Sequence, residues 1–251
     1  MPFYQKRGII PEKRHIQFRD KDNNLLWEEL ISRKGFSGIY SNAYHKYPPT
    51  KVKRIGNFER IRLKSIKEIH RPHHLLTSKL NLLGDCLSSR VPLFFNSNIV
   101  ISKAHCTDSM DYLYRNGFSD ELLFIHSGKG IFKSNFGNIK IKSGDYIVIP
   151  RGVIWQVEIF EPLHILIIES NGAINTPSKY RNEFGQLLEH SPFCERDIKT
   201  PEFIDPVEEK HIEVKVKVHN GIQSYIYQHH PFDLVGWDGY YFPYVFNICD
   251  F

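Results

Sequence analysis

Histidine is the residue type in this chain best suited to metal chemistry, and one short stretch holds three of the 13 histidines. This stretch is His70-Arg71-Pro72-His73-His74. Neutral imidazole is a common ligand of zinc and iron. On a strand, however, the adjacent His73 and His74 would face opposite sides and could not bind one ion together. Pro72 also prevents the helical spacing of an HExxH site. The spacing therefore disfavours a metal site here.

Glu121 is a second candidate for a metal ligand because of the turn residues that follow it. Gly128 lies seven positions later, and the stretch Gly144-Asp145-Tyr146-Ile147-Val148-Ile149-Pro150-Arg151-Gly152 comes next. The Gly-Asp and Pro-Arg-Gly residues are typical of turns at the two ends of a short strand. This pattern resembles the two motifs of the cupin family. The resemblance implies a jelly-roll barrel, in which antiparallel strands form a double sheet.

The histidines that a metal-binding cupin carries around this glutamate are missing from the sequence. The corresponding positions hold Tyr114, Arg115, Asn116 and Gly117 before Glu121, and Trp155 after Gly152. None of these residues replaces a neutral imidazole as a ligand of a divalent metal. We therefore expect cupin architecture with no metal-binding, cofactor-binding or catalytic residue on this chain. Since fold does not imply function, any chemistry is expected elsewhere.

Length and composition indicate one folded β-rich unit. The chain has 251 residues, of which 41% are hydrophobic, 14% aromatic and 24% charged. This suits one large all-β domain, or a barrel with extensions. The net charge of +5 suits a small anion and does not by itself indicate nucleic acid. The basic residues between Lys51 and His70 could bind phosphates, but such runs are more often a solvated face.

Cysteine usage and hydropathy indicate a cytoplasmic protein. The four cysteines, at positions 86, 106, 194 and 249, form no CxxC pair and are expected to be reduced thiols. The N-terminus has no apolar signal segment, and no run of about 18 apolar residues appears. We therefore expect a soluble protein that is neither exported nor bound to a membrane.

Alternation of apolar and polar residues predicts most of the strands. Ile61 and Leu63 alternate with basic residues, which predicts a strand with one buried face. Ile99–Lys103 is strand-like, and the apolar Leu163–Ile168 is expected to be a central core strand. Ile212–Val218 and Ile222–Tyr227 flank Asn220-Gly221, which predicts a β-hairpin with a type I′ turn.

One α-helix is predicted after the barrel motif. Thr176 can cap a helix and Pro177 suits its first position. Tyr180, Phe184, Leu187 and Leu188 follow at helical spacing and would form one apolar face. Ser191-Pro192 would end the helix. The fold class expected is therefore mainly β, a cupin or jelly-roll barrel with an N-terminal β-rich arm and one clear α-helix.

Three segments are expected along the chain. Residues 1–95 form an arm and β-rich segment that packs on the barrel, and residues 96–170 form a degenerate cupin barrel. Residues 171–251 hold the helix, the hairpin and a junction to a further catalytic barrel.

The tail from His229 to Phe251 is rich in aromatic residues, whereas termini are usually polar. We therefore expect that the polypeptide continues, and that an exposed aromatic tail makes this chain self-associate.

Several longer stretches together resemble the N-terminal part of homogentisate 1,2-dioxygenases of the shorter bacterial type. They span nearly the whole chain. They are Arg14-His15 with Gln17-Phe18-Arg19, Gly35-Phe36-Ser37-Gly38 through Tyr44-His45 to Pro48-Pro49-Thr50, Met110-Asp111-Tyr112, Gly144 to Gly152, Tyr180-Arg181-Asn182-Glu183 through Glu189-His190-Ser191-Pro192 to Glu195-Arg196-Asp197, His229-His230-Pro231-Phe232-Asp233, and Gly236-Trp237-Asp238-Gly239.

The resemblance implies a two-barrel enzyme whose N-terminal barrel is the degenerate one. Its C-terminal barrel would hold non-haem Fe(II) on two histidines and a glutamate, which leaves positions open for substrate and dioxygen. The family opens the ring of homogentisate to maleylacetoacetate in tyrosine and phenylalanine breakdown, as a hexamer made of trimers. The equivalents of its iron ligands and catalytic histidine lie beyond Phe251. The full enzyme is expected to need Fe(II), and this chain alone is not.

The histidines of this chain are not assigned to that site. His73 and His74 match no ligand position. His229 and His230 match a family motif and are expected to pack and hydrogen-bond at the junction between barrels. Two alternatives stay open. One is a non-catalytic scaffold or ligand-binding barrel, with an apolar ligand among Tyr112, Tyr114 and Trp155. The other, a metal cupin such as an isomerase, is disfavoured by the ligand positions.

Overall fold

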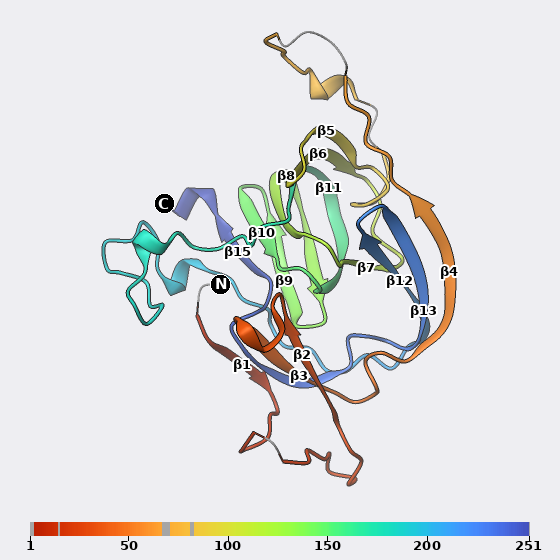
Figure 1. The fold of residues 1–251 in the computed structure, drawn as a ribbon, viewed down its shortest axis with the longest axis vertical. Coiled ribbons are helices and arrows are strands. Elements are labelled where there is room, and N and C mark those ends of the chain that lie inside the picture. The colour runs from red at the N-terminus through yellow and green to blue at the C-terminus, as the bar shows by residue number, and fades with distance from the viewer. Residues whose placement is uncertain (1–2, 15, 67–70, 81–82, 251) are drawn as a thin grey trace.

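The computed structural model describes residues 3–14, 16–66, 71–80 and 83–250, and its regular structure is almost entirely β (Figure 1). The described residues form 15 strands and five short 3-10 turns. The strands are β1 (Gln5–Gly8), β2 (Trp27–Ser32), β3 (Tyr40–His45), β4 (Val52–Arg60), β5 (Val91–Phe95), β6 (Ile99–Cys106), β7 (Leu113–Asn116), β8 (Asp120–Ser134), β9 (Gly137–Lys142), β10 (Asp145–Ile149), β11 (Ile154–Ser170), β12 (Lys210–Val218), β13 (Gly221–His229), β14 (Leu234–Gly239) and β15 (Tyr244–Asn247). The 3-10 turns are η1 (Gly35–Ser37), η2 (Thr77–Lys79), η3 (Ser178–Tyr180), η4 (Glu195–Asp197) and η5 (Ile248–Asp250).

Eleven strands make one large jelly-roll-like sheet. Its path runs β15-β10-β8-β11-β7-β12-β13-β4, with β6 also on β11, β5 on β6 and β9 on β8. The path ends at β15 and β4, so the sheet does not close into a barrel. The mainly β fold predicted from the sequence is confirmed.

The long strand β11 lies at the centre of this sheet, as its apolar sequence predicts. Leu163–Ser170 pairs with β6 on one side, and nearly the whole strand pairs with β8 on the other. Leu163, Ile165 and Ile167 are fully buried. Hydrophobic burial of such alternating side chains is the main favourable term in assembling the sheet.

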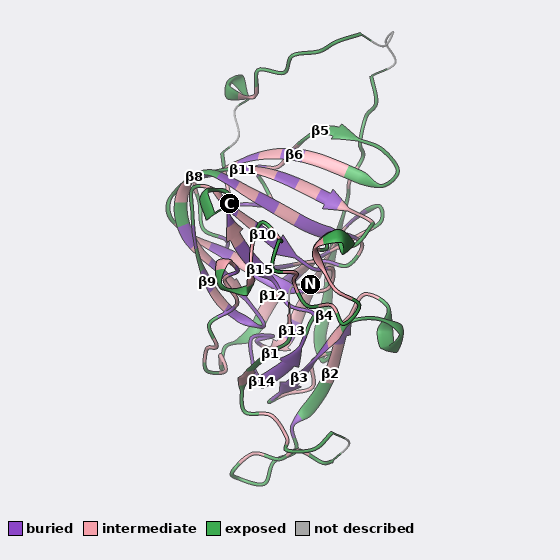
Figure 2. Ribbon diagram, turned by 90° about the vertical axis from the view of Figure 1, so that its left-hand side faces the viewer, coloured by how far each residue is buried: buried purple, intermediate pink, exposed green. Residues whose placement is uncertain are grey.

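A smaller sheet joins the two ends of the chain. Its order is β1-β14-β3-β2, so that Gln5 is the register partner of Gly239. Figure 2 shows that β3 and β14 carry most of its buried residues. The Trp237 indole Nε1 donates a hydrogen bond of 2.9 Å to the Phe136 carbonyl. This bond ties the small sheet to the core of the large one.

The α-helix predicted from Thr176 to Leu188 is wrong. The described residues contain only the short turn η3 there, and Arg181 forms a β-bridge with Leu187. Gly185 has φ of +82°, and the Asn182 side chain accepts hydrogen bonds from the Phe184 and Gln186 backbone N–H groups. Such an Asn-centred turn competes with helix. Phe184 is 81% exposed, so no apolar helical face forms.

The predicted hairpin is confirmed, but its turn differs. Val218 pairs with Gly221, so the two-residue loop is His219–Asn220. Neither residue has the positive φ that a type I′ turn requires. Gly221 has another role: a Cβ there would lie 2.3 Å from the Glu59 carbonyl oxygen. The glycine therefore permits close approach of β4 rather than a left-handed turn.

Two further predictions are corrected by burial. A strand with Ile61 and Leu63 on one buried face was expected, but β4 ends at Arg60 and Leu63 is exposed. Within β4 itself, every residue except the half-buried Gly56 is exposed. β4 lies at the end of the sheet path and pairs only with β13. The aromatic tail was expected to be exposed, but Trp237, Phe242 and Tyr244 are buried. Residues 67–70 lie outside the described part of the chain.

Within the described residues, no helix is long and apolar enough to cross a bilayer.

Candidate functional site

Two carboxylates lie side by side at one end of the paired strands β8 and β11. Glu121 on β8 and Glu169 on β11 are register partners in an antiparallel pair. Their exposed fractions are only 0% and 3%. Like charges directly opposite each other on neighbouring strands are destabilising, and burial raises that cost. The arrangement therefore requires compensating positive charge.

Arg90 supplies the first positive charge. It lies immediately before β5, and its Nη1 donates a hydrogen bond of 2.6 Å to Glu121 Oε1. The same nitrogen is 3.6 Å from Glu169 Oε1. The Arg90 side chain is only 8% exposed. Burial lowers the pKa of this guanidinium, but the Glu121 and Glu169 carboxylates raise it by more, so Arg90 stays charged.

Lys217 supplies the second positive charge. Its Nζ donates to Glu169 Oε2 at 2.5 Å, and the Asn116 side-chain amide donates to the same oxygen at 3.0 Å. Burial raises the pKa of Glu169, but Arg90 and Lys217 together hold it below its ordinary value. Two carboxylates and two basic groups thus balance, which is the usual condition for ionised groups in a protein interior.

Aromatic rings form the walls around the Arg90 guanidinium. Its Cζ lies 5.3 Å from the centre of the Tyr114 ring and 5.9 Å from that of Trp155. The two rings contact each other edge to face, with centroids 5.2 Å apart. Both distances from the cation are within cation–π range. We call Arg90, Tyr114, Glu121, Trp155, Glu169 and Lys217 the Arg90 cluster.

The residues of the Arg90 cluster do not suit a divalent metal ion. Glu121 is the residue that a cupin would use as a ligand, and here it accepts a hydrogen bond from a guanidinium. A cation beside Arg90 would be repelled, and the Tyr114 and Trp155 positions supply rings instead of imidazoles. Among the described residues, no group of three or more His, Cys, Asp or Glu is placed to hold a metal.

Three polar atoms of the Arg90 cluster are buried without a hydrogen-bond partner among the described residues. They are Arg90 Nη2, Trp155 Nε1 and Glu121 Oε2. The first two are donors and the third is an acceptor. Buried polar groups are nearly always hydrogen-bonded, so these three call for an explanation. A small polar molecule that both accepts and donates hydrogen bonds would satisfy them.

A pocket of about 630 Å³ opens beside the Arg90 cluster. Arg90, Glu169 and Lys217 belong to its lining, and so do Tyr112 and Lys215. The Lys215 ammonium lies 3.4 Å from the centre of the Tyr112 ring. We call this space the Lys215 pocket. It differs from the expected apolar site, because Tyr114 and Trp155 lie behind Arg90 and do not line it.

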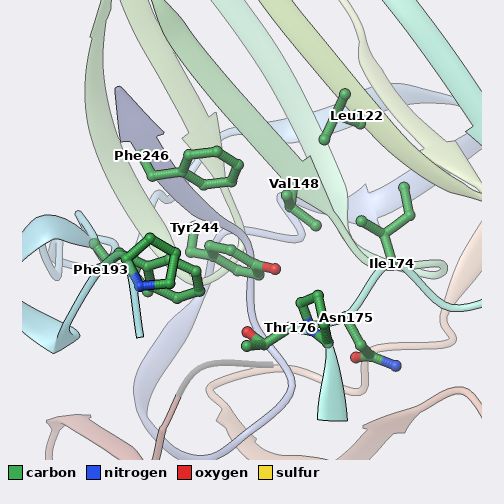
Figure 3. Close-up of a pocket in the computed structure, with 11 residues that line it drawn as sticks. Leu122, Val148, Ile174, Asn175, Thr176, Phe193, Tyr244 and Phe246 are labelled. Carbon is green, nitrogen blue, oxygen red and sulfur yellow. The ribbon is translucent and has the colours of Figure 1, made fainter. Parts of the chain in front are cut away.

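A second, smaller pocket is apolar. Its volume is about 310 Å³, and it lies where β15 forms the edge of the large sheet (Figure 3). Tyr244 and Phe246 on β15, Val148 on β10 and Leu122 on β8 contribute to its walls, and Phe193 lies beside Tyr244. The polar side chains in its lining are Asn175 and Thr176, beside the Tyr244 phenol, so the pocket offers few hydrogen bonds to a ligand.

The histidines considered in the sequence lie apart from the Arg90 cluster. His73 and His74 are exposed, and His70 is outside the described residues. The His229 ring stacks on Tyr47 with centroids 3.9 Å apart. His230 is buried, and its Nδ1 accepts a hydrogen bond from the Phe232 backbone N–H. Burial lowers the pKa of His230, which favours the neutral ring.

Sequence reasoning missed three members of the cluster. None of Arg90, Glu169 and Lys217 was singled out from the sequence. Arg90 and Glu121 are 31 residues apart, so no local spacing links them. The one available signal was Glu169 itself, a charged residue at the end of an apolar strand.

The chain is similar to one family model and to several curated proteins. A family model described as the homogentisate 1,2-dioxygenase N-terminal domain matches residues 61–248. A protein of Saccharolobus solfataricus named as a dioxygenase is 40% identical over 252 residues, covering 100% of this chain and 65% of its own length. The homogentisate 1,2-dioxygenase of Nitrobacter hamburgensis is 32% identical over 134 residues, which cover 52% of this chain and 29% of that enzyme.

The human homogentisate 1,2-dioxygenase is 24% identical over 165 residues, covering 62% of this chain and 35% of that enzyme. The chain thus spans about two thirds of the first relative, and the matches span about a third of the homogentisate enzymes. Among solved structures, a cupin protein of Bacteroides fragilis aligns at 17% identity with a TM-score of 0.31, covering 47% of this chain and 94% of that one.

Proposed function

Because the chain belongs to the homogentisate 1,2-dioxygenase family, we propose that it forms the structural N-terminal part of an Fe(II)-dependent dioxygenase acting on homogentisate. The reaction would open the aromatic ring to maleylacetoacetate, in cytoplasmic tyrosine and phenylalanine breakdown. The family match over residues 61–248 and the relatives named as dioxygenases support this proposal.

The Arg90 cluster is the observation that supports a structural role for this chain. The carboxylate at the cupin ligand position, Glu121, is held by a buried guanidinium 2.6 Å away. We therefore propose that the iron lies in a second domain, on two histidines and a glutamate outside these 251 residues. When bound there, Fe(II) would bring dioxygen and the ring together.

The role of this chain would be to support that second domain and to build the oligomer. We propose a hexamer made of trimers, the assembly that the family resemblance implies. The substrates of the full enzyme would be a small aromatic acid and dioxygen, with no nucleic acid and no membrane as partner.

The experiment compares this chain alone with a fusion that supplies the proposed second domain. The fusion joins the chain to the segment of the Saccharolobus relative that lies outside the match, about a third of that protein. Each protein is mixed with Fe(II), ascorbate and homogentisate, and oxygen uptake is followed with an electrode. The Nitrobacter enzyme serves as the positive control.

The expected result is oxygen uptake by the fusion and none above background by the chain alone. Turnover by the chain alone would contradict the structural role. A folded, iron-loaded fusion that leaves homogentisate unchanged would contradict the proposed substrate.

A further inference from the structure

We propose that the Lys215 pocket binds a small organic anion, namely a carboxylate with a short apolar body. This site lies on the described chain itself and would exist whether or not the chain is part of a dioxygenase. Three features lead to this class of ligand: the charge of the lining, a lysine ammonium without an acidic partner among the described residues, and an apolar wall.

The lining of the pocket carries an excess of positive charge. Its basic residues are Arg62, Arg90, Lys215 and Lys217, and its acidic residues are Glu59 and Glu169. Arg90 and Lys217 are already balanced within the Arg90 cluster by Glu121 and Glu169. The remaining charged residues of the lining are the basic Arg62 and Lys215 and the acidic Glu59. A concave surface with a net positive charge attracts anions.

Lys215 is the basic group best placed to bind the anion. It alternates with Lys217 on β12, so both side chains leave the same face of the strand. Within the described part of the chain, Lys215 has no acidic partner, and its contact is the Tyr112 ring at 3.4 Å. An ammonium held over a ring keeps donors free for a carboxylate. The Tyr112 hydroxyl donates elsewhere, to Asp85 at 2.7 Å.

Arg90 adds positive charge at the wall of the pocket. It belongs to the pocket lining, although its side chain is only 8% exposed and its Nη2 is buried. Its guanidinium therefore attracts an anion through its charge, and the Lys215 ammonium makes the direct contact with the carboxylate.

The apolar wall of the pocket favours a ligand whose carboxylate is attached to an apolar body. Leu87, Pro92, Val100 and Ile222 contribute aliphatic groups to the lining. A volume of about 630 Å³ is within the usual range for small-molecule sites. An inorganic ion would leave this wall in contact with water. A carboxylate with several methylene groups would cover it and gain hydrophobic free energy.

The test uses hexanoate as the probe, with 1-hexanol and inorganic phosphate for comparison. Binding is followed by NMR titration of the purified chain. The variant is Lys215→Gln, which keeps length and hydrogen bonding but removes the charge. The matched control is Lys129→Gln, because Lys129 lies on β8, pairs with Glu161 at the surface and is not in the pocket lining.

The expected result is saturable binding of hexanoate that Lys215→Gln weakens about tenfold and Lys129→Gln leaves unchanged. Hexanol and phosphate should bind much more weakly. The proposal is overturned if hexanoate does not saturate, if hexanol binds equally well, if phosphate binds as tightly as hexanoate, or if Lys215→Gln binds like the parent chain. Loss of dioxygenase activity in the fusion would not affect any of these outcomes.

Discussion

Arg90 Nη1 and Glu121 Oε1 lie 2.6 Å apart in the interior, although 31 residues separate them in the sequence. The pair joins the segment before β5 to the start of β8. It also places a fixed positive charge between two carboxylates that neighbouring strands bring together. The stability of the large sheet should therefore depend on this one guanidinium.

Replacing Arg90 with methionine should destabilise the chain strongly. The change leaves Glu121 buried without its cation, and removal of one partner of a buried pair costs about 3–5 kcal/mol. Urea unfolding followed by tryptophan fluorescence measures this loss. Lys129→Met is the control, because it breaks only the exposed Lys129–Glu161 pair and should cost at most about 1 kcal/mol.

The double variant Arg90→Met, Glu121→Leu tests the explanation. It removes both charges, so it should recover much of the stability lost in Arg90→Met. A double variant as unstable as the sum of the two single variants would show that Arg90 acts through packing on Tyr114 and Trp155 instead.

His45 should make stability depend on pH in the alkaline range. Its Nδ1 lies 2.6 Å from Asp233 Oδ1 and its Nε2 lies 3.1 Å from Glu29 Oε2. Burial lowers the pKa of His45, but the hydrogen bonds to Asp233 and Glu29 outweigh it and raise the pKa to about 9. The folded state therefore binds the proton more tightly than the unfolded state, whose histidine pKa is near 6.5.

The stabilising effect of the His45 proton is fully present below pH about 6.5 and is lost as pH rises through about 9. Relative to His45→Gln, the chain should lose roughly 3 kcal/mol of unfolding free energy across this range. Urea titrations of both proteins at pH 6, 8 and 10 give the difference. A difference that does not change with pH would contradict a charged His45.

Gly221→Ala should destabilise the junction of β13 with β4. The new Cβ would lie 2.3 Å from the Glu59 carbonyl oxygen, which is backbone and cannot move aside cheaply. We expect a loss of about 1–3 kcal/mol, the usual cost of overpacking. Gly172→Ala is the control, because its Cβ would meet only Ser170 Oγ at 3.5 Å. Equal midpoints for the two variants in a thermal melt would contradict the close approach.

The four cysteines should react in a fixed order. Cys249 is exposed, Cys194 is half-buried, and Cys86 and Cys106 are buried. A neighbouring Cys106 and burial raise the pKa of the Cys86 thiol, which suppresses the reactive thiolate. With Ellman's reagent, Cys249 should react first, Cys194 more slowly, and the buried pair only in urea. Rapid reaction of all four thiols in the native chain would argue against this core.

Structural features that arise from neighbouring residues could be predicted from the sequence, and features that arise from contacts between distant segments could not. Leu163–Ile168 and the β12–β13 hairpin were predictable, because alternation of side chains along one strand determines burial. The helix from Thr176 failed because Asn182 and Gly185 favour a turn that the apolar spacing does not reveal. The Arg90 cluster depends on contacts between segments far apart in the sequence, so no spacing rule could have found it.

The pairing of β1 with β14 has a consequence for how the protein is made (Figure 2). Gln5 can meet Gly239 only after the ribosome has released most of the chain. Until then β1 lacks its partner strand, and β4 likewise has no partner until β13 has been synthesised. Pairings between such distant segments raise the contact order and slow folding. The N-terminal residues should thus stay accessible to chaperones and proteases throughout synthesis, and the small sheet should be the last part of the chain to form.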